Sequence, residues 1–122
     1  MNDQAEIAGV LQKYFQGLFR SDVNLLREAF HPSARVFGEV RGKPYEYDME
    51  SFLAATAKRK SPHERGESFE MEALNVEIVN NVAQVKARCP MTGLVYLDFL
   101  ALARADSGWR ITNKLFTSID AA

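Results

Sequence analysis

The stretch GLVYLDFLALA, residues 93–103, is apolar on both alternating faces of a strand at every position but one. A strand of this kind is typical of a sheet that is covered on both sides. The exception is Asp98. Burying an unpaired carboxylate costs on the order of several kcal/mol or forces the group to stay protonated. Asp98 must therefore have a structural ion-pair partner or stand at the chemical centre of a pocket.

Three helices are predicted in the first half of the chain. Residues 3–19 carry apolar side chains at spacings of three and four, namely Ile7, Val10, Leu11, Tyr14 and Leu18. Ser21 or Asp22 can cap a second helix over residues 23–30, which ends because Pro32 disfavours helical geometry at His31. A third helix is predicted to begin at Tyr47 or Asp48. Its expected inward residues are Met49, Phe52, Leu53 and Ala57.

Strands are predicted in the rest of the chain. Residues 34–40 form a short strand followed by a turn over residues 41–44, and the polar residues 58–68, which begin with the charged run KRK, form a solvated loop. Phe69 and Met71 share one parity of the next strand, and a change of parity predicts a bulge near Ala73. Asn80-Asn81 suits a tight hairpin, and turns at CPMTG and DSG separate two further strands, over residues 94–104 and 109–119. The order predicts an α+β roll: three N-terminal helices packed on a curved antiparallel sheet.

Composition excludes several kinds of partner. The chain has 122 residues, a length typical of one domain, and we take residues 1–122 as that domain. A net charge of −1 predicts no attraction to nucleic acid or anionic membrane, and no apolar run approaches the roughly 18 residues that span a bilayer. The single cysteine, Cys89, and the lack of a signal peptide favour the cytoplasm. Because Cys89 has no histidine or second cysteine at ligand spacing, we expect no metal and no cofactor.

Two blocks of the sequence carry a resemblance to a known family. RSDVNLLREAFHPSARVFG and YLDFLALARADSGWRITNKLF are similar to the nuclear-transport-factor-2-like superfamily, and within it to a bacterial group described as putative lumazine-binding. The resemblance implies the cone-shaped, cystatin-like roll that ketosteroid isomerases also use. It further implies a pocket between the concave sheet face and the helices. It also implies a homodimer through the convex sheet face.

The resemblance to ketosteroid isomerases does not extend to their catalytic groups. Those enzymes use a carboxylate base together with a tyrosine and a neutral aspartate that hold the enolate oxygen. Tyr14 aligns with the tyrosine, but Gly38 stands at the position of the base and Ala101 at the position of the neutral aspartate. We therefore expect no isomerase chemistry of that kind.

Asp98 has two interpretations. A three-residue loop at DSG would place Asp98 opposite Phe116 and Lys114 diagonally on the same sheet face, where the two charged groups can pair. A slip of one residue would move Lys114 to the opposite face. In the alternative interpretation, Asp98 projects into the cone, where it binds a donor group of a ligand or acts as a general base.

Other side chains are candidates for the same pocket. His31 either caps the end of the second helix or faces the pocket as a proton donor or acceptor, which makes His31, Tyr14 and Asp98 the catalytic candidates. Trp109 belongs to the core or the dimer surface, or stacks on a planar ligand. The candidate ligand-binding residues are Tyr14, Phe52, Tyr96, Asp98, Trp109 and Lys114.

Three functions are compatible with these patterns. The leading hypothesis is a protein that binds a small, partly apolar molecule inside the cone. The second is a cofactor-free isomerase, dehydratase or cyclase that uses Asp98 or His31 as the base and Tyr14 as a hydrogen-bond donor. The third is a non-catalytic dimeric scaffold whose cone is filled by its own side chains.

Overall fold

Each helix of the computed structural model, which describes residues 2–119, begins at a side chain that caps it. Helix α1 (Asp3–Arg20) follows Asn2, helix α2 (Val23–Ala29) follows Asp22, and helix α3 (Met49–Lys58) follows Asp48. The capping oxygens accept backbone N–H groups of the first turn, at 2.8 Å for Asp48 and Ser51. The predicted cap Asp22 is confirmed, and α3 begins at Met49, one residue after Asp48, one of its two predicted starts. Residues 1 and 120–122 of the predicted domain lie outside the described residues.

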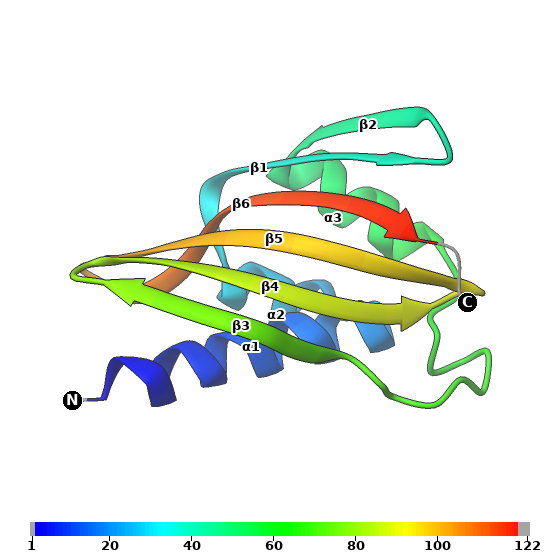
Figure 1. Cartoon of the computed structure of the whole chain (residues 1–122). Coiled ribbons are helices and arrows are strands. Elements are labelled where there is room, and N and C mark those ends of the chain that lie inside the picture. The colour runs from blue at the N-terminus through cyan, green and yellow to red at the C-terminus, as the bar shows by residue number, and fades with distance from the viewer. Residues whose placement is uncertain (1, 120–122) are drawn as a thin grey trace.

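The strands form one open, curved sheet of mixed direction in the order β2-β1-β6-β5-β4-β3 (Figure 1). The bounds are β1 (Phe30–Val40), β2 (Lys43–Asp48), β3 (Glu72–Val79), β4 (Val82–Met91), β5 (Leu94–Ala105) and β6 (Gly108–Ile119). Strands β3 to β6 are the predicted antiparallel meander. Strand β1 lies parallel to β6, so the prediction of an antiparallel sheet throughout is wrong at this one pair.

The sequence analysis missed strand β2. The predicted turn at residues 41–44 shrinks to Arg41 and Gly42, which both adopt positive φ angles of 51° and 85°. This tight turn folds Lys43–Asp48 back onto β1 as an antiparallel hairpin. Strand β1 also begins earlier than expected, at Phe30. Its register with β6 shifts between Phe30 and Arg35, a segment that contains the sequence HPS.

Smaller differences concern α3 and β3. Met49, Phe52 and Leu53 of α3 are buried as predicted, but Ala57 is exposed and Thr56 is buried in its place. Phe69 and Met71 precede β3 rather than belong to it. The predicted bulge is confirmed by a register shift just after Ala73.

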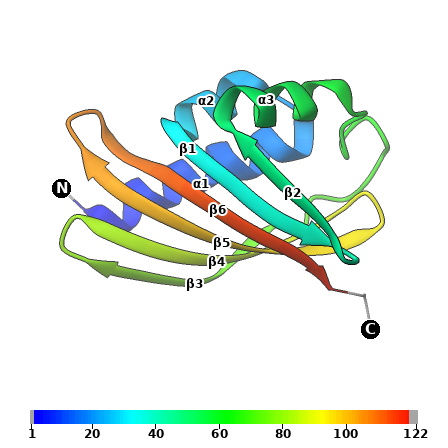
Figure 2. The same ribbon diagram turned by 90° about the horizontal axis from the view of Figure 1, so that it is seen from above.

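All three helices lie on one face of the sheet, and the core fills the space between them (Figure 2). Tyr14 of α1 is fully buried there, together with apolar side chains from the concave face of β4 and β5. None of the described residues covers the convex face: Phe99 of β5 is 41% exposed and Leu115 of β6 is 52% exposed. Strand β5 was expected to be covered on both sides. The described residues cover its concave side and leave its convex side exposed.

Gly38 allows β1 to approach the ring of Phe116 on β6. A Cβ atom at position 38 would overlap that ring, whereas a Cβ at Gly9 in α1 would meet nothing within 4 Å. We expect Gly38→Ala to lower the free energy of unfolding by about 1–3 kcal/mol, because the Phe116 ring must move. Gly9→Ala, the same chemical change in a helix interior, is expected to raise it by roughly 0.5–1 kcal/mol. Urea denaturation of both variants measures the difference, and equal effects would contradict the contact.

Candidate functional site

Asp98 lies at the middle of β5, with only 1% of its surface exposed. Its Oδ2 atom accepts hydrogen bonds from the hydroxyl of Tyr14 and from the thiol of Cys89, at 3.5 Å in the second case. The Nζ atom of Lys114 lies 3.9 Å from the same oxygen. The structure thus brings together Asp98, Lys114 and Tyr14, which are far apart in the sequence, as one buried polar cluster that we call the Asp98 cluster.

A bulge in β6 places Lys114 in this cluster. The hairpin between β5 and β6 closes with Ala105 opposite Gly108, which leaves a loop of two residues rather than the three expected. The register then shifts between Ala101 and Leu102, and Thr112 is the extra residue of β6. Beyond this shift Asp98 lies opposite Phe116, as predicted, and Lys114 points to the concave face. Without the bulge, Lys114 would face the convex side.

The surroundings of the Asp98 cluster determine which groups carry charge. Burial raises the pKa of Tyr14 and of Cys89 above their ordinary values, so both keep the protons that they donate to Asp98. Burial lowers the pKa of Lys114, and the charge of Asp98 opposes this effect. The Nζ atom of Lys114 also lies 5.1–5.2 Å from the ring centroids of Tyr14, Phe52 and Phe116, which favours its cationic form.

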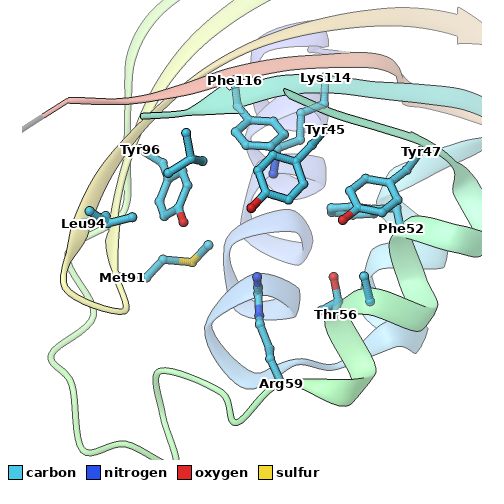
Figure 3. A pocket seen from close by; sticks show the side chains of 12 residues that line it. Tyr45, Tyr47, Phe52, Thr56, Arg59, Met91, Leu94, Tyr96, Lys114 and Phe116 are labelled. Atoms are coloured by element: carbon cyan, nitrogen blue, oxygen red, sulfur yellow. The ribbon is translucent and has the colours of Figure 1, made fainter. Parts of the chain in front are cut away.

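A cavity of about 380 Å³ opens between the concave face of the sheet and α3. Figure 3 shows its walls: β5 and β6 on one side, β2 and α3 on the other. The lining residues are Val40, Tyr45, Tyr47, Phe52, Ala55, Thr56, Arg59, Met91, Leu94, Tyr96, Lys114 and Phe116. A cavity of this volume contradicts the alternative of a cone filled by its own side chains.

Aromatic rings form a continuous wall of the cavity. Tyr96 contacts Phe116, Phe116 contacts Tyr45, and Tyr45 stacks on Tyr47, with centroid distances of 6.1, 6.3 and 6.3 Å. Tyr47 in turn contacts Phe52 at 6.4 Å. These rings belong to four elements of the fold, and the curvature of the sheet gathers them around one space (Figure 3).

Two cations reach this cavity from opposite sides. Lys114 comes from the sheet, and Arg59 comes from the C-terminal end of α3 (Figure 3). Burial lowers the pKa of Arg59 from its ordinary value. Its Nε and Nη2 atoms are buried and have no hydrogen-bond partner among residues 2–119. Lys114 has Asp98 as its counter-ion. Within residues 2–119, no group forms a hydrogen bond or an ion pair with these two atoms of Arg59.

The structure separates the predicted site residues into two groups. Phe52, Tyr96 and Lys114 line the cavity, whereas Tyr14 and Asp98 do not and belong to the buried cluster around Lys114. Trp109 lies elsewhere, where its indole N–H donates to Asp3 of α1 at 3.2 Å.

His31 also lies away from the cavity lining. Its Nδ1 atom accepts the backbone N–H of Ser33 at 3.0 Å, a local bond at the start of β1. His31 therefore neither caps α2, whose C-terminal cap is Phe30, nor lines the cavity as a proton donor or acceptor.

Sequence reasoning missed Tyr45, Tyr47, Arg59 and Phe116 as cavity residues. Tyr45 falls between the predicted turn at residues 41–44 and the predicted third helix, and Tyr47 was a predicted start of that helix, although their spacing of two around Glu46 is a strand signal. Arg59 belongs to the KRK run that was predicted to be a solvated loop. The packing of α3 turns this one residue of the run toward the cavity. No local sequence pattern predicts that orientation.

Two absences apply to the part of the chain that the structure describes. Within residues 2–119, no group of three or more histidine, cysteine, aspartate and glutamate side chains is arranged to hold a metal ion. No helix of these residues is both long and apolar enough to cross a membrane.

Comparison with known proteins adds a family and a fold. Residues 2–117 match a family model described as putative lumazine-binding. An NTF2-like protein of unknown function from Methylobacillus flagellatus superposes with a TM-score of 0.86 at 23% identity, over 96% of this chain and 92% of that chain. One from Silicibacter pomeroyi gives 0.78 at 19% identity, over 94% of both chains. A cystatin-like fold protein from Burkholderia xenovorans gives 0.69 at 15% identity, over 97% and 92%. A search of curated proteins found no match.

We predict that substitutions of the two charged groups of the Asp98 cluster have strongly non-additive effects on the free energy of unfolding. Asp98→Leu leaves the buried cation of Lys114 without a counter-ion, and Lys114→Met leaves the carboxylate without one, so each should lower the free energy of unfolding by about 3–5 kcal/mol. The double variant removes both charges, and we expect it to lose at least about 1 kcal/mol less than the sum of the single losses. Urea denaturation of the four proteins measures the coupling.

The exposed pair of Arg27 and Glu50 supplies the control for this cycle. Its N–O distance is shorter, at 2.7 Å, but its side chains are 52% and 71% exposed, and its coupling should stay below about 1 kcal/mol. Additive effects of Asp98→Leu and Lys114→Met would contradict a paired buried cluster.

Proposed function

This chain belongs to the putative lumazine-binding family of NTF2-like domains, and from that premise we propose that it binds a small planar ring compound in its cavity. The aromatic wall carries the proposal, because five rings in mutual contact offer flat apolar surfaces on which a planar ligand can stack. A volume of about 380 Å³ lies within the usual range of small-molecule sites. The name of the family, which refers to a bicyclic heteroaromatic compound, agrees with a ligand of this shape.

Binding accounts for the positions of the polar groups better than proton transfer does. A general base must lie within hydrogen-bond reach of its substrate. Asp98 and His31 do not line the cavity, and within residues 2–119 Tyr14, Cys89 and Lys114 hold Asp98 Oδ2 in place. In this proposal Tyr14 and Asp98 position Lys114, and Lys114, Tyr96 and Phe52 contact the ligand.

Substitution of a wall ring tests the proposal. We expect lumazine and 2-naphthamide to bind, and Tyr45→Ala to weaken their binding about 5- to 150-fold, since stacking on one aromatic side chain contributes about 1–3 kcal/mol. Phe37→Ala is the matched control, because this ring lies on neighbouring β1 but is 46% exposed on the convex face. Isothermal titration calorimetry measures the affinities. If neither compound bound at millimolar concentration, or if both variants were weakened equally, the proposal would be wrong.

We also propose that the chain forms a homodimer through the convex face of the sheet. Phe37, Leu115 and Phe99 are register neighbours on β1, β6 and β5, and they form one apolar row with exposures of 46%, 52% and 41%. A shallow apolar depression beside the row is lined by residues of the same three strands. A second copy related by a two-fold axis would cover the row with an identical row. This arrangement would cover the second face of β5, as its apolar sequence requires.

The oligomeric state tests the dimer. Light scattering after gel filtration should give twice the chain mass for the native protein and the mass of a single chain for Leu115→Asp, which places a charge in the centre of the row. Val82→Asp is the control: Val82 is 57% exposed but lies at the start of β4, away from the row, and the variant should stay dimeric. A native protein that is monomeric at tens of micromolar would contradict this interface.

The cytoplasm is the compartment that we propose for this binding. The support is the single cysteine, because Cys89 is a free thiol that is buried against Asp98 and forms no disulfide.

A further inference from the structure

Among the described residues, Arg59 is the charged group of the cavity wall that has buried donors without a partner. Its Nε and Nη2 atoms are both buried, and neither has a hydrogen-bond partner within the described residues. Buried donors without partners are uncommon in folded proteins, because each loses its hydrogen bonds to water and gains none in return. A ligand group that displaces the side chains covering these atoms and accepts from Arg59 would remove this penalty.

The two unused donors lie on the same edge of the guanidinium group. Nε and Nη2 are bonded to the same carbon atom, and their N–H bonds run side by side in one plane. A carboxylate presents two oxygen atoms at a matching spacing, and this bidentate pairing is the strongest hydrogen-bonding arrangement that arginine forms. The unused edge therefore has the shape of a carboxylate site.

The other charges around the cavity leave a single cation to be neutralised. Asp98 compensates Lys114 at 3.9 Å, and the hydroxyl of Tyr14 and the thiol of Cys89 stay protonated beside them. Arg59 remains without a counter-ion at the opposite wall. One uncompensated cation fits a ligand with one negative charge. A phosphate group would bring up to two charges and three acceptor oxygens into a wall that is mainly aromatic and aliphatic.

We propose that the ligand of this cavity is an aromatic carboxylate, whose carboxylate binds the Nε and Nη2 edge of Arg59 while its ring lies against the wall formed by Tyr45, Phe116 and Tyr96. The inference rests on the proposed function, since it names the chemical class of compound that the cavity takes. It assigns Arg59 as the residue that selects for the charge. The hydroxyls of Tyr45 and Tyr96, which point to the same space in Figure 3, are available as further donors to the carboxylate.

The test compares two probes of the same size and shape, 2-naphthoate and the uncharged 2-naphthamide. Calorimetric titration of the native protein should show 2-naphthoate binding at least about 10-fold more tightly, because a hydrogen bond to a charged group contributes about this factor or more. In Arg59→Gln the preference should disappear, because the affinity for 2-naphthoate should fall by at least about 10-fold more than the affinity for 2-naphthamide. Arg59→Lys keeps the charge but loses the paired donors, and it should retain only part of the preference.

Lys58→Gln is the matched control. It removes one positive charge from the adjacent residue of α3, but Lys58 is exposed and does not line the cavity, so the preference should stay at its native value. Thermal unfolding of each variant shows whether it is folded at the temperature of the titration.

The outcomes separate the two proposals. If the native protein binds both probes equally, or if Arg59→Gln keeps the preference for 2-naphthoate, the carboxylate inference is overturned while the cavity remains a ring-binding site. If the native protein binds neither probe, this inference is overturned, and if lumazine does not bind either, the proposed function fails with it.

Discussion

Asp98 is a carboxylate in the middle of an apolar strand, and its burial is tolerable only because Lys114, Tyr14 and Cys89 converge on one of its oxygens. That convergence depends on one extra residue, Thr112, in the partner strand. The hydroxyl of Thr112 donates to the carbonyl of Ala101 at 3.2 Å, at the position where the register shifts. The bulge, the buried ion pair and the attachment of α1 to the sheet through Tyr14 are therefore one structural unit.

The same unit determines the charge of the cavity above it. Lys114 lies in the cavity wall, but Asp98 compensates its charge and three rings surround its ammonium group. The uncompensated cation of the wall is Arg59, which comes from a different element and has buried, unused donors. The Asp98 cluster, in which Oδ2 has three partners, thus lies next to a cation whose two buried donors have none within the described residues, and this cation is the group that we assign to a ligand.

Much of this fold could be predicted from local patterns, because apolar periodicity and capping residues act over a few positions. The antiparallel meander and the register of Asp98 opposite Phe116 were both predicted. The register, however, was inferred from a three-residue loop, whereas the structure has a two-residue loop and a bulge that together give the same pairing. The parallel pairing of β1 with β6 and the inward turn of Arg59 could not be predicted, since both depend on how distant elements pack.

The decisive measurement is a crystal structure of the protein grown with 2-naphthoate. It shows whether the cavity binds an aromatic ring and whether the charge of Arg59 is neutralised by the ligand. The account predicts a carboxylate within about 3 Å of both Nε and Nη2 of Arg59, with the naphthalene ring against Phe116 and Tyr45. A structure in which Arg59 pairs with a carboxylate of its own chain or turns to solvent, with the ligand absent from the cavity, would contradict it.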